Sequence, residues 1–159
     1  MVSSEILMFY FSIGIFFWVI LFSIILNRLI FHKQFAQKFM PTLFILIAPP
    51  SIGFIAYVKL ENDLDLFAHI LFNLGLFFTL LIFFMYKNFT NIKFFISWWA
   101  FTFPLVTITL ASMLMYSKMH SAFYLYVSYF LLFFVTTVVF VVAYKTVVHM
   151  KRKEICIME

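Results

Sequence analysis

The run AFYLYVSYFLLFFVTTVVFVVAY, from Ala122 to Tyr144, contains 23 residues and no Asp, Glu, Lys or Arg. About 20 apolar residues in a helix span the ~30 Å hydrocarbon core of a bilayer. The run does not alternate between apolar and polar residues, and it is about twice as long as the ~10-residue strand of a membrane barrel. It therefore predicts a transmembrane helix.

Four further stretches of the chain have the same character, and none contains an acidic or basic side chain. The first of them is too long for a cleaved signal peptide and has no basic residue before it. We therefore expect an all-α integral membrane protein whose residues 1–159 form a single transmembrane domain. Its five spans are predicted at about 6–27, 41–58, 66–86, 94–116 and 122–144.

The composition excludes several classes of protein. Of the 159 residues, 66% are apolar and 11% are charged, whereas soluble domains are about 45–50% apolar and about 25% charged. A soluble fold of this size buries only about two-thirds of its unfolded surface and would leave much apolar area in water. We therefore expect lipid around the protein, and we exclude a soluble enzyme, a disordered chain, a disulfide scaffold and a nucleic-acid partner.

The basic residues gather at one end of the predicted spans. Cytoplasmic loops carry an excess of Lys and Arg, so this bias predicts a multi-pass protein of the plasma (inner) membrane with its N-terminus outside and its C-terminus in the cytoplasm. The predicted cytoplasmic side holds Arg28, Lys33, Lys38, Lys87, Lys93, Lys145, Lys151, Arg152 and Lys153. The opposite side holds Lys59 and Lys118, with Glu5, Glu61, Asp63 and Asp65.

Prolines interrupt the second and fourth spans near the middle, as Pro49-Pro50 and Pro104. Each of these spans runs outward and is followed by an uninterrupted return span, which indicates a parallel repeat of about 55 residues around an axis along the membrane normal. Proline frees a backbone carbonyl, and lipid cannot satisfy it. A kink filled by a neighbouring helix would explain one proline, but the repeated position favours a cavity lined by helix ends that attract an anion.

Catalytic chemistry has little basis in this sequence. His69 is the only ionisable group within a predicted span apart from tyrosines and lies about one turn from its start. No nucleophile–base set, glycine-rich phosphate loop or acidic metal cluster is present. We therefore expect no enzyme activity, no cofactor and no bound metal.

Two segments resemble the signatures of a known family. Phe31-His32-Lys33 followed by PTLFILIAPP (Pro41–Pro50) is similar to one signature of the tellurite-resistance/dicarboxylate transporter family, and WWAFTFP (Trp98–Pro104) is similar to a second. That family includes bacterial TehA and the plant slow anion channels. The hydropathy layout agrees across nearly the whole chain.

The resemblance implies ten helices in five hairpins around a quasi-fivefold axis, usually as a trimer, with the five spans here as helices six to ten. This chain would then be the C-terminal half. Spans two and four would line the pore, kinked at Pro49, Pro50 and Pro104. Phe103 would be the pore gate, with Phe101 as the alternative. The candidate pore wall residues are Ser51, Gly53, Thr102 and Thr107.

The function expected from the resemblance is an anion channel or transporter that moves a small inorganic anion or small carboxylate through a Phe-gated pore. Tellurite resistance and dicarboxylate transport are the roles associated with the family. Because five of the family's helices are missing, the expected partner is a missing N-terminal half or further copies in a homo-oligomer. The alternative is a truncated or non-transporting membrane subunit that only assembles with a partner.

Overall fold

The computed structural model describes residues 4–31, 37–90 and 93–153, and these are helical apart from short turns and connections. The expected all-α class is confirmed, and the described residues contain no strand. The elements in chain order are α1 (Ser4–Phe31), the 3-10 helix η1 (Gln37–Leu46), α2 (Ala48–Glu61), α3 (Leu66–Phe84), α4 (Lys87–Thr90), the 3-10 helix η2 (Ile96–Phe101), α5 (Thr102–Met119) and α6 (Ala122–Lys151).

Five helical segments are long and apolar enough to cross a bilayer, as the sequence predicts. In two of them a 3-10 helix continues into an α-helix. The bounds of the five segments are Ser4–Arg28, Met40–Glu61, Leu66–Phe84, Ile96–Met119 and Ala122–Lys151. These bounds leave the predicted spans largely unchanged, but the last helix continues about two turns beyond its predicted end at residue 144.

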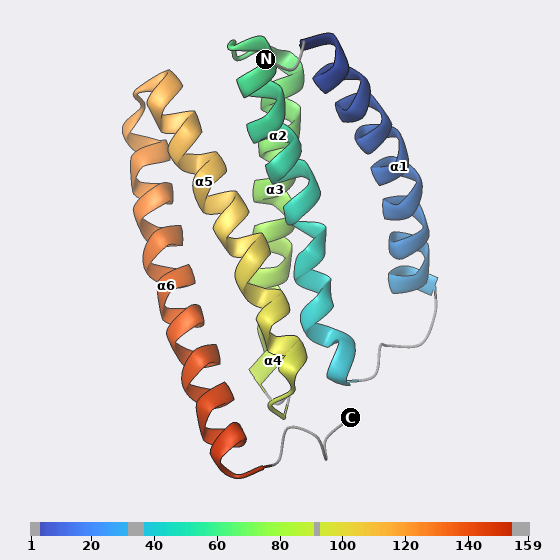
Figure 1. Cartoon of the computed structure of the whole chain (residues 1–159). Coiled ribbons are helices and arrows are strands. Elements are labelled where there is room, and N and C mark those ends of the chain that lie inside the picture. The colour runs from blue at the N-terminus through green and yellow to red at the C-terminus, as the bar shows by residue number, and fades with distance from the viewer. Residues whose placement is uncertain (1–3, 32–36, 91–92, 154–159) are drawn as a thin grey trace.

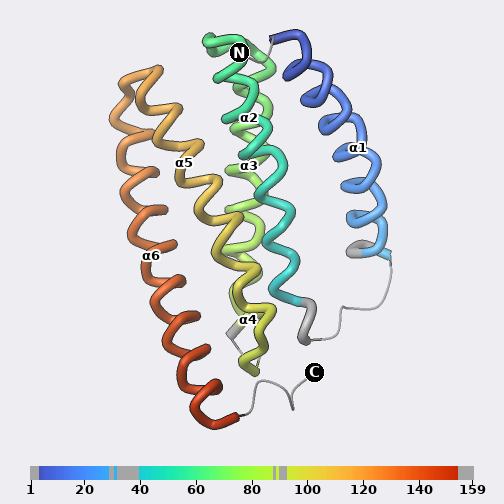
Figure 2. The backbone as a smooth tube through the Cα atoms, viewed as in Figure 1, coloured from blue at the N-terminus to red at the C-terminus, as the bar shows by residue number. Residues whose placement is uncertain are grey.

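The five segments run alternately up and down the bundle (Figure 1). Helices α2 and α5 run in the same direction and pack against each other, and η1 packs against η2 at their lower ends. The return helices α3 and α6 each pack against the helix that precedes them, and α1 lies along the edge next to α2. The tube view in Figure 2 shows the resulting repeat, because the α2–α3 pair and the α5–α6 pair follow the same course.

The core of the bundle lies where α2, α3 and α5 meet. Phe54, Phe72 and Ile108 are fully buried there, and the Phe54 and Phe72 ring centroids are 5.3 Å apart. Burying a side chain of this size stabilises a fold by about 1.5–3 kcal/mol relative to water, although in lipid the gain comes chiefly from close packing. Helix α1 differs, since none of its described side chains is buried.

The two proline-containing helices, α2 and α5, are called the inner helices below. Each of them ends on a residue whose backbone angles lie in the left-handed region. Asn62 (φ 59°) follows α2 and its N–H bonds the Val58 carbonyl, while His120 (φ 52°) follows α5 and its N–H bonds the Tyr116 carbonyl. A residue in this conformation reverses the chain directly after a helix. The return helix then starts within a few residues, and Asp65 caps α3 by accepting the Ala68 N–H at 2.9 Å. These tight reversals hold each inner helix beside its return helix.

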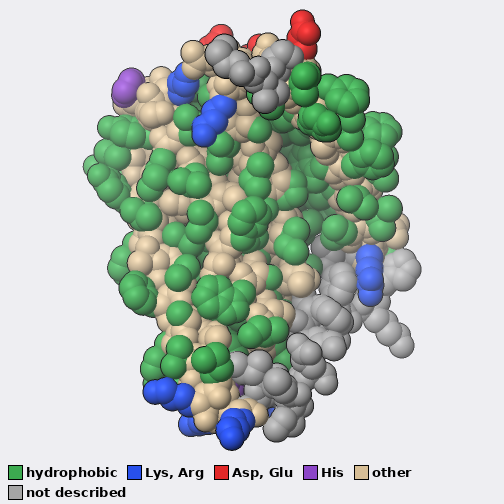
Figure 3. All heavy atoms as spheres, viewed as in Figure 1, with side chains coloured by type: hydrophobic (Ala, Val, Ile, Leu, Met, Phe, Trp, Pro, Cys, Tyr) green, Lys and Arg blue, Asp and Glu red, His purple; other side chains and the backbone are tan. Residues whose placement is uncertain are grey.

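Charged side chains occupy the two ends of the bundle and leave the middle apolar (Figure 3). The upper end carries the described acidic residues, and the lower end is basic. The described Lys and Arg of the basic side lie in the C-terminal parts of α1 and α6, directly after α3 and α6, or before η2, as the sequence pattern indicates. This separation is the arrangement of a protein that spans a bilayer.

Candidate pore wall

Both proline breaks are changes of helix type. Helix α2 begins at Ala48, directly after η1, and Pro49 and Pro50 occupy its first turn. Helix α5 begins at Thr102, directly after η2, with Pro104 as its third residue. Proline suits the first turn of an α-helix because its missing N–H has no partner there in any case. The two breaks start 54 residues apart, close to the predicted repeat of about 55.

Hydroxyl groups bond the backbone at both breaks. Ser51 Oγ donates to the Ile47 carbonyl at 2.7 Å, and Thr102 Oγ1 donates to the Trp99 carbonyl at 2.9 Å. Thr107 Oγ1 donates to the Pro104 carbonyl at 2.8 Å. A proline frees the carbonyl four residues before it, and none of these three acceptors stands four residues before a proline. The hydroxyls therefore bond other carbonyls of the breaks and add local contacts to them.

The backbone N–H groups at the breaks are also bonded. The Ile47 N–H donates to the Phe44 carbonyl at 3.0 Å, the Ser51 N–H donates to the Ile47 carbonyl at 3.4 Å, and the Thr102 N–H donates to the Trp99 carbonyl. An anion site at a helix N-terminus requires several unpaired N–H groups. The structure therefore corrects the expectation of exposed half-helix ends, because each 3-10 helix leads directly into its α-helix.

Three of the four predicted wall residues lie inside the bundle. Ser51 is fully buried against α3, where the Cβ of an alanine at position 75 would come 2.7 Å from Ser51 Oγ. Thr107 is 5% exposed. Gly53 is also buried, within reach of Ile15 and Leu71. Thr102 is half-buried. In the described part of the chain these residues pack or bond between helices, and their role in a pore wall stays a prediction.

Each inner helix presents one apolar stripe that the other described elements leave largely exposed, although Trp99 Nε1 donates to Thr146 Oγ1 of α6 at 3.1 Å. The exposed and half-buried residues recur every three or four positions, which places them on one helical face. The stripes consist of Ile45, Pro49, Ile52 and Ala56 on the η1–α2 segment and Trp99, Phe103, Val106 and Leu110 on the η2–α5 segment. The sequence could have identified the stripe residues only by their spacing of three or four positions from the prolines. In a span where nearly every residue is apolar, residue type does not show which face stays uncovered.

The two candidate gate residues have different surroundings. Phe103 belongs to the uncovered stripe and is 58% exposed. Phe101 is half-buried in an aromatic cluster, with its ring centroid 4.7 Å from that of Phe44 and 6.1 Å from that of Phe89. Phe101 therefore holds η2 against η1, whereas Phe103 is available to a pore or to lipid.

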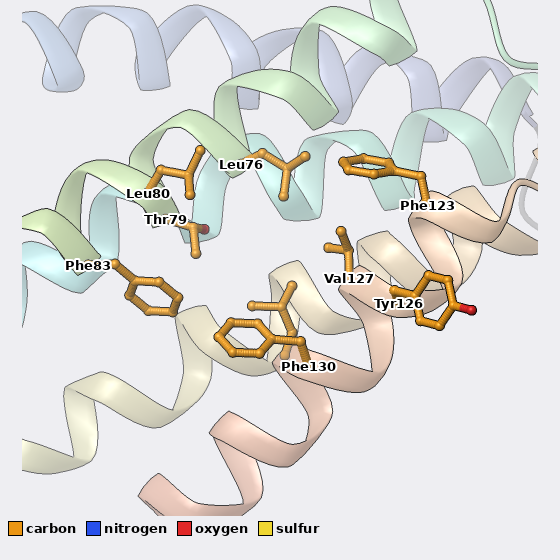
Figure 4. Close-up of a pocket in the computed structure, with 9 residues that line it drawn as sticks. Leu76, Thr79, Leu80, Phe83, Phe123, Tyr126, Val127 and Phe130 are labelled. Atoms are coloured by element: carbon orange, nitrogen blue, oxygen red, sulfur yellow. The ribbon is translucent and has the colours of Figure 1, made fainter.

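A groove of about 520 Å³ separates the return helices α3 and α6 (Figure 4). Phe83 and Phe130 face each other at one end with centroids 6.3 Å apart, Leu76 and Val127 line the middle, and Phe123 lies at the opposite end. Its lining is almost entirely apolar, because the Thr79 hydroxyl donates to the Gly75 carbonyl of its own helix. This groove lies away from the stripes of α2 and α5 and offers an anion no polar partner.

The upper ends of the inner helices are linked by polar contacts. Lys118 Nζ donates to the Asn62 carbonyl at 2.9 Å and to the Asn62 side-chain oxygen at 3.0 Å. Tyr57 donates its hydroxyl to Asp65 at 2.5 Å. That hydrogen bond, followed by the bond from the Ala68 N–H, holds the pKa of Asp65 below its usual range. No group of three or more potential metal-ligating side chains occurs among the described residues.

The model of the voltage-dependent anion channel family matches residues 3–147. The chain belongs to this family. The predicted resemblance is thereby confirmed at the level of an anion channel and transporter family, and the chain is a multi-pass membrane protein of this kind. No solved structure matches the chain.

Relatives of this anion channel family member include plant and archaeal proteins. The S-type anion channel SLAH3 of Arabidopsis thaliana is 25% identical over 141 residues, which cover 89% of this chain and 22% of that protein. SLAH2 of the same plant is 27% identical over 65% of this chain and 20% of its own length. An uncharacterized transporter of Methanocaldococcus jannaschii is 27% identical over 76% of this chain and 39% of its own. The chain thus spans between about a fifth and two-fifths of these relatives.

Proposed function

We propose that the uncovered stripes of α2 and α5 form part of the wall of a pore that conducts a small inorganic anion or small carboxylate. The observation that carries this proposal is the pair of proline-started helices, which lie side by side and leave one face uncovered in a member of an anion channel family. The S-type channels among the relatives support an anion as the permeating ion.

Two inner helices cannot enclose a pore by themselves. The return helices cover the backs of α2 and α5, and most of each stripe stays exposed. A closed pore therefore requires further inner helices beyond the described residues, either from the remaining hairpins of the family fold or from additional copies of this chain. The chain alone would otherwise be the non-transporting subunit considered above. We propose that it occupies the position of helices six to ten of the family fold.

Selectivity in this proposal comes from the width and the apolar lining of the pore. The stripe residues between Ile45 and Ala56, and between Trp99 and Leu110, include no charged side chain. A ring of apolar side chains in a narrow pore blocks ions by excluding water, and smaller side chains remove the block. Phe103 is the largest exposed side chain of this stripe within α5 itself, so we propose it as the gate.

The pore proposal also includes the orientation of the bundle in the membrane and the ions that it conducts. The basic lower end of the bundle faces the cytoplasm of a plasma membrane, and the acidic upper end faces outward. Dicarboxylates and tellurium oxyanions are candidate ions for the pore. Flux of chloride, nitrate and a C4-dicarboxylate into the same vesicles would rank them.

The test is anion flux into vesicles that contain the assembled channel with and without the Phe103→Ala change. We expect at least a ~tenfold rise in flux, which corresponds to a barrier lowered by about 1.4 kcal/mol. Phe140→Ala is the matched control, because Phe140 is 71% exposed on α6 and lies outside the stripes, close to the level at which Trp99 bonds Thr146. Equal flux from the two variants in a normally assembled protein would contradict the gate.

A further inference from the structure

A second groove, of about 540 Å³, lies between α1 and the lower part of the η1–α2 segment. It follows α1 from Gly14 to Arg28, and on the other side it reaches from Thr42 to Pro49. Its apolar lining comes from α1, with Phe17, Trp18, Leu21, Phe22, Ile24 and Ile25, and from Leu43, Ile45 and Leu46 opposite. Because α1 lies at the edge of the bundle (Figure 1), lipid can reach this groove.

The polar side chains of the groove lie toward its lower end. Arg28 belongs to the last turn of α1, and Thr42 lies opposite it on η1. Arg28 belongs to the basic residues that the sequence pattern places on one side of the predicted spans. A guanidinium offers five N–H donors in a planar fork that suits phosphate oxygens. Basic pockets between membrane helices at such an interface bind anionic lipid headgroups.

The dimensions of the groove fit one lipid chain that enters from the basic side. Gly14 and Arg28 are 14 residues apart, which is roughly 21 Å along a helix with a rise of 1.5 Å per residue. One leaflet contributes about half of the ~30 Å hydrocarbon core. A chain anchored at the level of Arg28 would therefore run along most of the groove toward Gly14.

We propose that this groove binds an anionic phospholipid, with the phosphate on Arg28 and one acyl chain between α1 and the η1–α2 segment. The occupant is a lipid of the leaflet at the basic end. The groove shares Ile45 and Pro49 with the stripe proposed as pore wall, so the lipid would lie beside that wall, but its test measures lipid binding and not ion conduction. The chain would lie against Leu46 and Pro49, so the lipid would connect α1 to the proline break of α2.

Gly14 provides a way to fill the groove without disturbing its walls. A Cβ at this position would meet no atom within 4 Å. Gly14→Phe should therefore place its ring in the space that the acyl chain occupies. Arg28→Gln removes the charge at the mouth, and Arg28→Lys retains it. Lys145→Gln is the matched control, because Lys145 is exposed at the same end on α6 and does not line the groove.

The experiment measures retained lipid by native mass spectrometry of the whole chain, after exchange into detergent with phosphatidylglycerol or phosphatidylcholine. We expect one phosphatidylglycerol per chain, bound at least ~tenfold more tightly than phosphatidylcholine. Gly14→Phe and Arg28→Gln should each reduce that binding at least ~tenfold, while Arg28→Lys and Lys145→Gln retain most of it. Circular dichroism would verify that each variant keeps its helix content.

Three results would overturn the proposal. Equal binding of the two lipids would show that the charge of the headgroup does not matter. Equal loss from Arg28→Gln and Lys145→Gln would show that the basic end attracts lipid without a site. A dimer that persists in phosphatidylglycerol and is lost only in Gly14→Phe would show that a second copy occupies the groove. If Gly14→Phe does not fold, lipid binding by Arg28→Gln compared with Lys145→Gln still tests the proposal.

Discussion

Lys118 reaches from the last turn of α5 to Asn62 at the end of α2, where its Nζ contacts both the carbonyl and the side-chain oxygen of that residue. Asn62 is the left-handed residue that reverses the chain into α3. One cation therefore fixes the distance between the two inner helices at their upper ends. The lower ends are held differently, by aromatic packing between η1 and η2.

Lys118→Met should loosen the upper end of the inner pair. Because the contact is exposed, we expect a loss of about 1 kcal/mol or less in the free energy of unfolding. Thermal denaturation in detergent would measure it as a lowered Tm. Lys59→Met removes a cation from the same end of α2 and should have a smaller effect. An equal fall in Tm for both variants would show that the loss comes from removing a positive charge at this end of the bundle and not from the contact with Asn62.

Phe101→Ala should act on stability, in contrast to Phe103→Ala. The Phe101 ring packs against Phe44 and Phe89, so its loss leaves a cavity in the aromatic cluster and should cost about 3 kcal/mol or more. Phe103 is mostly exposed, and its truncation should cost less than about 1 kcal/mol. Unfolding free energies of both variants test this difference. Similar losses would contradict the assignment of Phe101 to packing and Phe103 to the uncovered stripe.

Gly75→Ala should disturb the contact between α2 and α3. The added Cβ would lie 2.7 Å from Ser51 Oγ and 3.1 Å from Ile108 Cδ1, so we expect destabilisation by about 1–3 kcal/mol. The double variant with Ser51→Ala removes the closer of the two atoms and should recover part of the loss. A double-mutant cycle on the free energy of unfolding measures this coupling. Strict additivity would show that the Ser51 hydroxyl does not limit the approach of the two helices.

Asp65 should make stability depend on pH at the acid end of the range. Its pKa is lowered from 3.8 by the Tyr57 hydroxyl and the Ala68 N–H, so the folded state favours the carboxylate. The stabilisation is present above pH 3.8 and is lost as the pH falls through the lowered pKa. Tyr57→Phe should move the Asp65 pKa upward toward 3.8, as an NMR titration of the carboxyl carbon would show. An unchanged Asp65 pKa would mean that the hydrogen bond from the Ala68 N–H, and not the one from Tyr57, lowers it.

The sequence predicted the helical architecture because membrane burial requires long charge-free runs, and the absence of Asp, Glu, Lys and Arg from residues 122–144 is visible without any structure. The positions of the breaks at Pro49 and Pro104 were also predictable, since proline restricts its own backbone wherever it occurs. The 3-10 helices before them were not, because a helix of either type satisfies the same apolar pattern.

The directions of individual side chains could not be predicted. Ser51 was expected in a pore wall from the family resemblance, yet its hydroxyl lies 2.7 Å from the Ile47 carbonyl, where α2 passes close to Gly75 of α3. In a span where nearly every residue is apolar, the hydrophobic pattern does not distinguish the face toward a neighbouring helix from the face toward lipid or a pore. Only packing makes that distinction, and it left Ile52 and Val106 uncovered.

Helix α1 has no buried side chain among its described residues, while the other four spanning segments share a common core. It can therefore separate from the bundle without opening the contacts between Phe54, Phe72 and Ile108. Denaturation of the isolated chain should then follow two transitions, an early one with little loss of tertiary packing and a later one that is cooperative. A single unfolding temperature for this protein would describe only the second transition.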